Sequence, residues 1–136
     1  MSNASNVIQN MIENALMRTH TAFCAKVISV SGNFASVQPL NMVKAVGGNA
    51  QKQAVIPNVP ILQPTQKIEV TYTDRAYEET YSDQKAEVTY KNDIKAGDTV
   101  FCVCAERDIS ETRKGKFALP VKGRHMLSDA VIVGKL

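Results

Sequence analysis

Apolar residues follow two different periods along this chain. Within the range 6–18 they recur at i, i+3, i+4, i+7 and i+8, the spacing of one helix face: Ile8, Met11, Ile12, Ala15 and Leu16. Asn6 is a residue type that caps helices, and Gln9 follows three residues later as its partner, so the pattern predicts a helix over 6–18. Such a stripe packs either on the rest of its own chain or on a partner subunit.

From Phe23 onward the period is two, which is typical of strands with one buried face. Strands are predicted at 23–30 and 34–40, joined as a hairpin by a Ser-Gly-Asn turn at 31–33. A weak continuation at 43–46 and a short strand at 53–56 follow. Three prolines then restrict the range 56–62 to extended backbone at a sheet edge, because proline has no N–H to donate.

The range 66–92 differs in composition from its surroundings. The tetrapeptide Glu-Val-Thr-Tyr occurs at 69–72 and again at 87–90, and acidic and polar residues dominate between the two copies. No longer repeat accompanies the match, so it reflects strand composition and not a repeated unit. The pattern predicts a two-stranded hairpin arm over 66–92 with a solvated, acidic tip.

The most apolar strand is predicted at 99–105. Val100, Cys102 and Cys104 alternate with Phe101, Val103 and Ala105, so both faces are apolar, which is typical of a strand buried on both sides. One face would fill a small barrel, and the other would meet the helix or a neighbouring subunit. A polar turn or short helix at 109–115, a connector at 117–121 and a last strand at 130–133 complete the chain.

These elements predict a mainly β fold. We expect a small five- to six-stranded, OB-like Greek-key barrel with an N-terminal amphipathic helix and a protruding β-hairpin arm. The 136 residues fit one OB-like domain covering 1–136. A domain of this length buries enough surface to fold without a metal or a disulfide.

Composition narrows the function. The net charge of +3 is small for a protein that binds nucleic acid by charge, and aromatic residues make up only 6% of the chain. No apolar run approaches the length of a membrane span, and the polar first residues do not resemble a signal peptide. Three cysteines, each among apolar neighbours, indicate buried reduced thiols and synthesis in a cytosol.

Metal and catalytic sites lack the residues they need. Cys102 and Cys104 share a strand face, but a zinc site needs two further ligands, and only Cys24 and two histidines remain. The cluster Glu106, Arg107 and Asp108 has no positioned nucleophile or base beside it. An ion-pair network that orients a turn or bridges subunits is the simpler interpretation. Arg124 and His125 indicate a similar polar corner. We expect no cofactor, no metal and no enzymatic activity.

One basic cluster is present, formed by Arg113, Lys114, Lys116, Lys122 and Arg124. An OB-type barrel binds single-stranded nucleic acid through such a cluster when aromatic side chains lie beside it. Only Phe117 lies among these residues. A solvated face or a docking patch is the simpler interpretation, and nucleic-acid binding is the alternative function.

Several segments in order resemble the N-terminal OB-fold domain of phage baseplate central spike proteins, the cell-puncturing tips of contractile tails. The matching ranges cover roughly 25–136. They are 25–30 with 37–40, Ile-Pro-Asn-Val-Pro-Ile at 56–61 with Pro64, Ile-Lys-Ala-Gly-Asp-Thr-Val at 94–100, Ala-Glu-Arg-Asp-Ile at 105–109, and Arg-His-Met-Leu-Ser-Asp-Ala-Val at 124–131.

The resemblance implies a structural protein of a phage, a prophage or a related contractile injection system. It would be made in the bacterial host cytoplasm and located in the virion tail baseplate, as a homo-oligomer, most simply a trimer, docked on the tail hub protein. Family members often continue into a β-helical shaft with an iron-binding tip. Here the sequence stops at Leu136 without a His-x-His pair, so we expect a blunt plug, or a needle supplied by a separate chain.

The residues expected to form assembly contacts come from the helix stripe, the two polar clusters and the last strand. They are Ile8, Ile12, Leu16, Glu106, Arg107, Asp108, Arg124, His125, Val131 and Val133.

Overall fold

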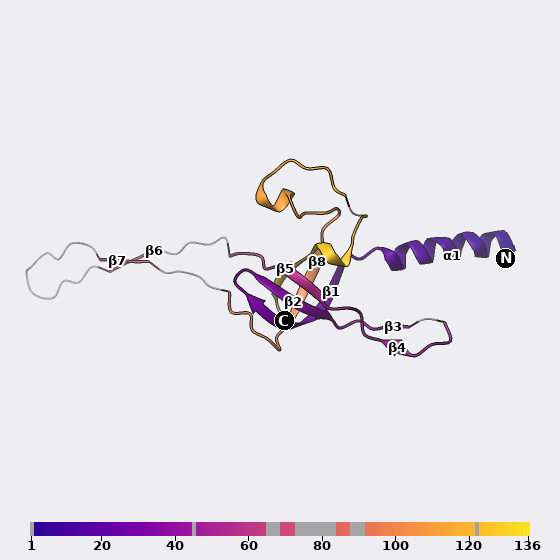
Figure 1. Ribbon diagram of the computed structural model, residues 1–136, viewed down its shortest axis with the longest axis horizontal. Helices are drawn as coiled ribbons and strands as arrows, with labels where there is room; N and C mark the ends of the chain where they lie inside the picture. The colour runs from indigo at the N-terminus through magenta and orange to yellow at the C-terminus, as the bar shows by residue number, and fades with distance from the viewer. Residues whose placement is uncertain (1, 45, 65–68, 73–83, 88–91, 122) are drawn as a thin grey trace, which may run out of the picture. The chain divides into compact units, whose positions relative to one another are not determined.

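The computed structural model describes residues 2–44, 46–64, 69–72, 84–87, 92–121 and 123–136. The chain divides into two compact units. The larger contains Met1–Leu62 with Ile94–Leu136, and the smaller is Gln63–Asp93. The described elements are mainly strands with one N-terminal α-helix, as the sequence predicts (Figure 1).

Helix α1 spans Asn3–Arg18, so it begins three residues before the predicted start. The predicted cap at Asn6 is wrong. Ser2 is the N-cap instead, because its hydroxyl accepts a hydrogen bond from the Ser5 N–H at 3.3 Å, and the Asn6 N–H already donates to the Ser2 carbonyl. The helix ends at Arg18, and Thr19 is its C-cap, with an extended backbone and a hydroxyl that donates to the Ala15 carbonyl at 2.9 Å.

Five antiparallel strands form the main sheet in the order β5-β2-β1-β8-β9. They are β1 at Ala22–Ser31, β2 at Phe34–Pro39, β5 at Ile56–Pro60, β8 at Thr99–Cys104 and β9 at Ala130–Lys135. β1 and β2 form the predicted hairpin, and the turn between them uses Gly32 at φ 59°. The register of β1 against β2 shifts between Val27 and Ser29, so β1 carries an irregularity where the sheet bends.

The sheet curls until its two edge strands meet. Directly after β5, Ile61 forms a parallel bridge with Ile132 of β9, and the Leu62 N–H donates to the Ile132 carbonyl at 2.9 Å. We call this junction the seam. The curl creates a half-barrel, and the proline-rich strand β5 lies at a sheet edge, as the sequence predicts.

The concave face of the sheet holds one apolar core. The side chains with the least exposure are Ile132, Val27, Val37, Val59, Val100 and Cys102. In β8 the predicted alternation is correct, since Val100, Cys102 and Cys104 are buried. The other face was expected to meet the helix or a neighbouring subunit. Phe101 and Val103 remain 37% and 38% exposed and α1 has no buried residue, so the described helix does not cover this face, and cover by a neighbouring subunit stays a prediction.

The short elements differ from their predicted bounds. Of the predicted strand 53–56 only Ile56 is in a strand, and the pairing continues to Pro60. β3 at Val43–Lys44 is shorter than predicted and pairs with β4 at Ala50–Gln51, which was not predicted. Two-residue strands have too little apolar alternation to be recognised in a sequence.

In the smaller unit, β6 at Glu69–Tyr72 pairs antiparallel with β7 at Gln84–Glu87. The first strand matches the predicted tetrapeptide. β7 covers 84–87, so it includes Glu87 of the second tetrapeptide at 87–90, and the other three residues of that tetrapeptide lie outside the described residues. Most of the predicted arm over 66–92, including its acidic tip, lies outside the described residues.

Between β8 and β9 the backbone is mostly irregular. The predicted polar turn at 109–115 contains a single 3-10 turn, η1, at Thr112–Lys114. A second one, η2, at Leu127–Asp129 leads into β9, which continues two residues beyond its predicted end. The connector predicted at 117–121 is neither helix nor strand.

Candidate assembly site

The apolar stripe of α1 is exposed along its whole length. Ile8, Ile12 and Leu16 keep 60%, 55% and 61% of their surface accessible, and no described residue of the helix is buried. Met11 is equally open at 66%. The expectation that the stripe packs on a surface is therefore not met by the described part of its own chain. Packing of the stripe on a partner subunit, the other expectation, stays a prediction.

A second uncovered apolar surface lies on the convex face of the sheet. We call it the outer patch and define it as Ala22, Cys24, Phe101, Val103, Val131 and Val133. Strand pairing brings its members together: Val103 lies opposite both Ala22 and Val131, and Phe101 lies opposite Cys24. The register of β8 against β9 shifts between Phe101 and Cys102, and Val133, which lies at this irregularity, is 42% exposed.

The two predicted polar clusters meet at one corner. The His125 N–H donates to the Glu106 carbonyl at 3.1 Å, and the Ala105 N–H donates to the Asp129 carbonyl at 3.0 Å. The segment after β8 and the segment before β9 are thereby held side by side. Glu106 and Arg124 are exposed at this corner, whereas Asp108 is buried.

Residues at the corner form hydrogen bonds with backbone groups. Asp108 accepts a hydrogen bond from the Ser110 N–H at 2.9 Å, which orients the turn after β8. His125 has a positive φ of 49°, and its carbonyl accepts from the His20 N–H at 3.2 Å. Nδ1 of His125 and Nε of Arg107 are buried without a hydrogen-bond partner among the described residues. The corner thus links the sheet to the chain that leaves α1.

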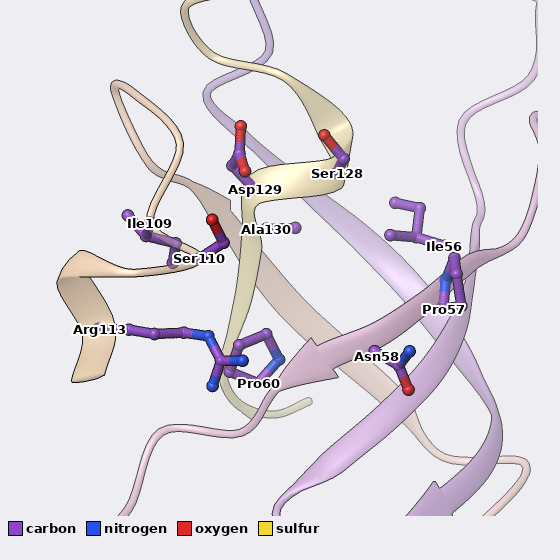
Figure 2. A pocket seen from close by; sticks show the side chains of 10 residues that line it. All are labelled: Ile56, Pro57, Asn58, Pro60, Ile109, Ser110, Arg113, Ser128, Asp129 and Ala130. Carbon is purple, nitrogen blue, oxygen red and sulfur yellow. The ribbon is translucent and has the colours of Figure 1, made fainter. Parts of the chain in front are cut away.

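A pocket of about 290 Å³ opens beside the corner, next to the seam (Figure 2). It is lined by Ile56, Pro57, Asn58, Pro60, Ile109, Ser110, Arg113, Ser128, Asp129 and Ala130. Arg113 extends from η1 toward the β5 side of the pocket, while Ser128 and Asp129 lie on η2. The Arg113 guanidinium also lies 5.0 Å from the centre of the Phe34 ring, a distance typical of cation–π contact.

Two of the three free thiols, Cys102 and Cys104, are buried in the core, whereas Cys24 is partly accessible. Burial, with smaller contributions from Cys104 and Cys24, raises the pKa of Cys102 to about 11. Burial and the nearby Asp129 carboxylate also raise the pKa of Cys104. Protonated thiols are poor nucleophiles and poor metal ligands. Within the described ranges, no three His, Cys, Asp or Glu side chains come together as a metal would require.

Part of the basic cluster is paired with an acid. Lys114 Nζ lies 2.9 Å and Lys116 Nζ lies 3.7 Å from the Glu111 carboxylate, and the hydrogen bond from Lys114 lowers the pKa of Glu111. Arg124 is exposed, and Lys122 lies outside the described residues. Phe117, the aromatic residue within the cluster, is fully exposed. The cluster is therefore a solvated surface with its charge partly compensated.

Compared with known proteins, the sequence matches no protein-family model and no curated protein. The resemblance to baseplate spikes consequently rests on the residues quoted for it. Among the helices of the described residues, none has the length and the apolar character that crossing a membrane requires.

Sequence reasoning found the helix stripe and the polar corner but not the full outer patch. Val131 and Val133 were predicted as assembly residues, and they lie beside Phe101 and Val103, whose face of the strand was predicted to meet the helix or a neighbouring subunit. The alternation in β8 indicated these two residues, because an apolar face that points outward is expected to pack against another surface. No signal pointed to the pocket, because its lining combines three separate segments of the chain.

Proposed function

We propose that this protein is a structural, non-enzymatic component of a phage or prophage tail baseplate. In this proposal it is a spike or plug protein that self-associates, most simply as a trimer, and docks on the tail hub. A separate needle or tip chain is a further partner. Its location is the virion tail baseplate, after synthesis in the host cytoplasm.

The observation that carries the proposal is the amount of uncovered apolar surface. The α1 stripe and the outer patch are two separate apolar faces, and both are exposed in the described chain. Soluble monomers rarely leave contiguous apolar surfaces open, whereas subunits of assemblies do so routinely. A protein whose exposed faces are apolar and uncharged is suited to permanent assembly.

The finer fold assignment, an OB-like Greek-key barrel, is part of the same proposal. It is supported by the strand order β5-β2-β1-β8-β9 together with the parallel bridge between Ile61 and Ile132. A five-stranded, partly open barrel in which two strands meet in parallel at the closing seam is the arrangement expected of this class.

Three segments that carry the baseplate resemblance converge in space. Residues of 56–61, 105–109 and 124–131 line the same pocket, and two of these segments are hydrogen-bonded to each other at the corner. Short matches that are far apart in sequence but adjacent in the fold are, as a set, more specific evidence of a family resemblance than each match alone. Their convergence supports the resemblance as a feature of the fold.

Light scattering after size exclusion tests self-association. We expect a mass three times the 14.9 kDa of one chain across micromolar concentrations. A stable monomer throughout that range would overturn the proposal. A second measurement addresses location: in tails purified from the protein's own host, gold label against a tagged chain should lie at the baseplate end. Tails that carry no label would exclude a baseplate component.

The same sample tests the alternative of an OB-fold that binds single-stranded nucleic acid. We expect no salt-dependent anisotropy change with a labelled single-stranded oligonucleotide. Binding that weakens steeply as salt increases would favour the alternative, because release of counterions is its physical signature.

A further inference from the structure

We propose that the apolar stripe of α1 in one copy of the chain covers the outer patch of a second copy. The stripe is defined as Ile8, Met11, Ile12, Ala15 and Leu16. This inference rests on the self-association proposed above and adds its contact surfaces. It names a helix-on-sheet contact, in which the two uncovered apolar faces of the chain cover each other.

The two faces are alike in chemistry. Every member of the stripe and of the outer patch is apolar or a thiol, so their contact desolvates no charged side chain. Helices and sheets with one apolar face are stable when they pack against such a face in a second layer. The sheet supplies one layer, and the helix supplies the other.

The two faces are also alike in size. From Ile8 to Leu16 the stripe extends roughly 12 Å along the helix axis. The outer patch crosses three adjacent strands, β1, β8 and β9, which is roughly 10 Å between the outer two. One contact buries on the order of 700 Å² if each side chain contributes as typical apolar residues do. In a two-fold dimer the two reciprocal contacts form one interface and together provide the area of a specific one. In a trimer each pair of subunits shares one contact, which is the area of a small interface.

The short link between helix and sheet favours a second copy over the same copy. The helix ends at Arg18, and the backbone is hydrogen-bonded again from His20 onward. The His20 N–H donates to the His125 carbonyl in the corner, and the Thr21 carbonyl accepts from the Cys104 N–H of β8 at 2.8 Å. Thr19 is the single residue between helix and anchor. The whole connection from Arg18 to β1 at Ala22 has three residues, 19–21, and the backbone hydrogen bonds of His20 and Thr21 leave only Thr19 to reverse the chain direction.

The helix needs a cover to be stable. With 16 residues, α1 is only slightly longer than the roughly 12–15 residues below which even alanine-rich helices are marginal in water. It also contains five asparagine or serine residues, which favour caps over helix interiors. A helix bundle made only of α1 copies would cover the stripe but leave the outer patch open. Contact between stripe and patch covers both faces at once, and repeated around a ring it leaves neither exposed.

A disulfide between two surfaces tests the contact directly. Cys24 is a native, partly accessible thiol of the outer patch, whereas Cys102 and Cys104 are buried. In the variant Ala15→Cys, the new thiol lies in the middle of the stripe. We expect mild oxidation to yield disulfide-linked dimers or larger species on a non-reducing gel. A disulfide forms only when the two Cα atoms approach within about 7 Å.

The matched controls separate the possible geometries. Asn10→Cys places the thiol on the opposite side of the helix and should give no linked species. Adding Cys24→Ser to Ala15→Cys should abolish the link. Links that persist without Cys24 would show a helix-to-helix contact, and a link within one chain would show that the helix folds back. Each of these results, or no link at all, would overturn the inference.

A second experiment separates this inference from self-association in general. Ile12→Asp puts a charge in the stripe, and Asn10→Asp puts the same charge on the polar side. We expect Ile12→Asp to raise the dissociation constant at least about tenfold in light scattering and Asn10→Asp to leave it unchanged. If Ile12→Asp assembles normally, the inference is wrong while the proposed oligomer stands. If the unaltered chain is a monomer, both are wrong.

Discussion

The curled sheet and helix α1 have equally clear apolar patterns, but only the sheet buries its pattern. Val27, Val37 and Ile132 in the sheet are almost inaccessible, whereas Ile8 and Ile12 in the helix are more than half exposed. The difference lies in the neighbours and not in the residues. The strands of the curled sheet bury their inner faces against one another, whereas no residue of α1 is buried by the described chain. An amphipathic pattern specifies which face of an element is buried. The surface that covers this face is specified by the rest of the assembly.

The strongest test of this comparison removes matched isoleucine side chains. Ile132→Ala leaves a cavity at the seam and should lower the free energy of unfolding by about 2–5 kcal/mol. Ile12→Ala in the helix should lower it by less than about 0.5 kcal/mol in dilute monomer, because an exposed side chain loses little on truncation. Urea titration followed by circular dichroism measures both. Equal effects in dilute monomer would mean that the stripe is covered within the chain.

A smaller effect is expected where the sheet depends on a backbone conformation. Gly97 has φ 93°, and its N–H donates to the Val27 carbonyl at 2.8 Å, which ties the lead-in of β8 to β1. Gly97→Ala should cost about 1–2 kcal/mol, since a Cβ is strained at this φ even with open space around it. Gly134→Ala, at a site without positive φ and with equal space, is the control. Thermal denaturation of the two variants should differ clearly.

Removal of the N-cap should lower the stability of the helix without affecting the sheet. Ser2→Ala removes the acceptor for the Ser5 N–H and should destabilise the helix by about 1 kcal/mol. Because α1 makes no buried contact in the described chain, the loss in dilute monomer should appear as reduced helical signal at 222 nm with no change in the unfolding midpoint of the sheet. A coupled shift of the midpoint would contradict the independence of the two regions.

The smallest effect concerns an exposed charge at the sheet end. The pKa of Asp98 is lowered, mainly because its carboxylate accepts from the Lys95 N–H at 2.9 Å and also because Lys135 lies 3.3 Å away. A depressed carboxyl pKa stabilises the fold above the unfolded value of 3.8, and this contribution is lost as pH falls through the folded value.

Asp98→Asn should therefore be slightly less stable than the unaltered chain at pH 7, and the difference should be smaller at pH 2, which is below the unfolded value of 3.8. Denaturant titrations at the two pH values measure it. A difference that is undiminished in acid would assign the effect to shape and not to charge.

Much of the sheet was predictable because its signals are local. The hairpin of β1 and β2 follows from alternation around a Gly-containing turn, and the prolines placed β5 at an edge. The start of α1 was missed because Asn6 and Ser2 are both good caps, and the choice depends on which N–H groups each can reach. The seam, the pocket and the outer patch depend on residues more than fifty positions apart, and no local pattern encodes such contacts.

The candidate site was predictable only in part. The residues of the last strand and the polar corner stood out by type, and the structure brings Glu106 and His125 together through their backbones. Their partners in the outer patch, Phe101 and Cys24, depend on the register of β8 against β1. A shift of one residue would turn both inward, and register is fixed by the whole sheet rather than by either strand.

The seam affects how binding at this location can change through substitutions during evolution. Where the edges of the main sheet meet, the Leu62 N–H and the Ile132 carbonyl are already hydrogen-bonded to each other. A partner binding there gains little from adding a strand and must recognise side chains instead. Binding preference at that location can then change one substitution at a time, without disturbing the pairing that holds the half-barrel closed.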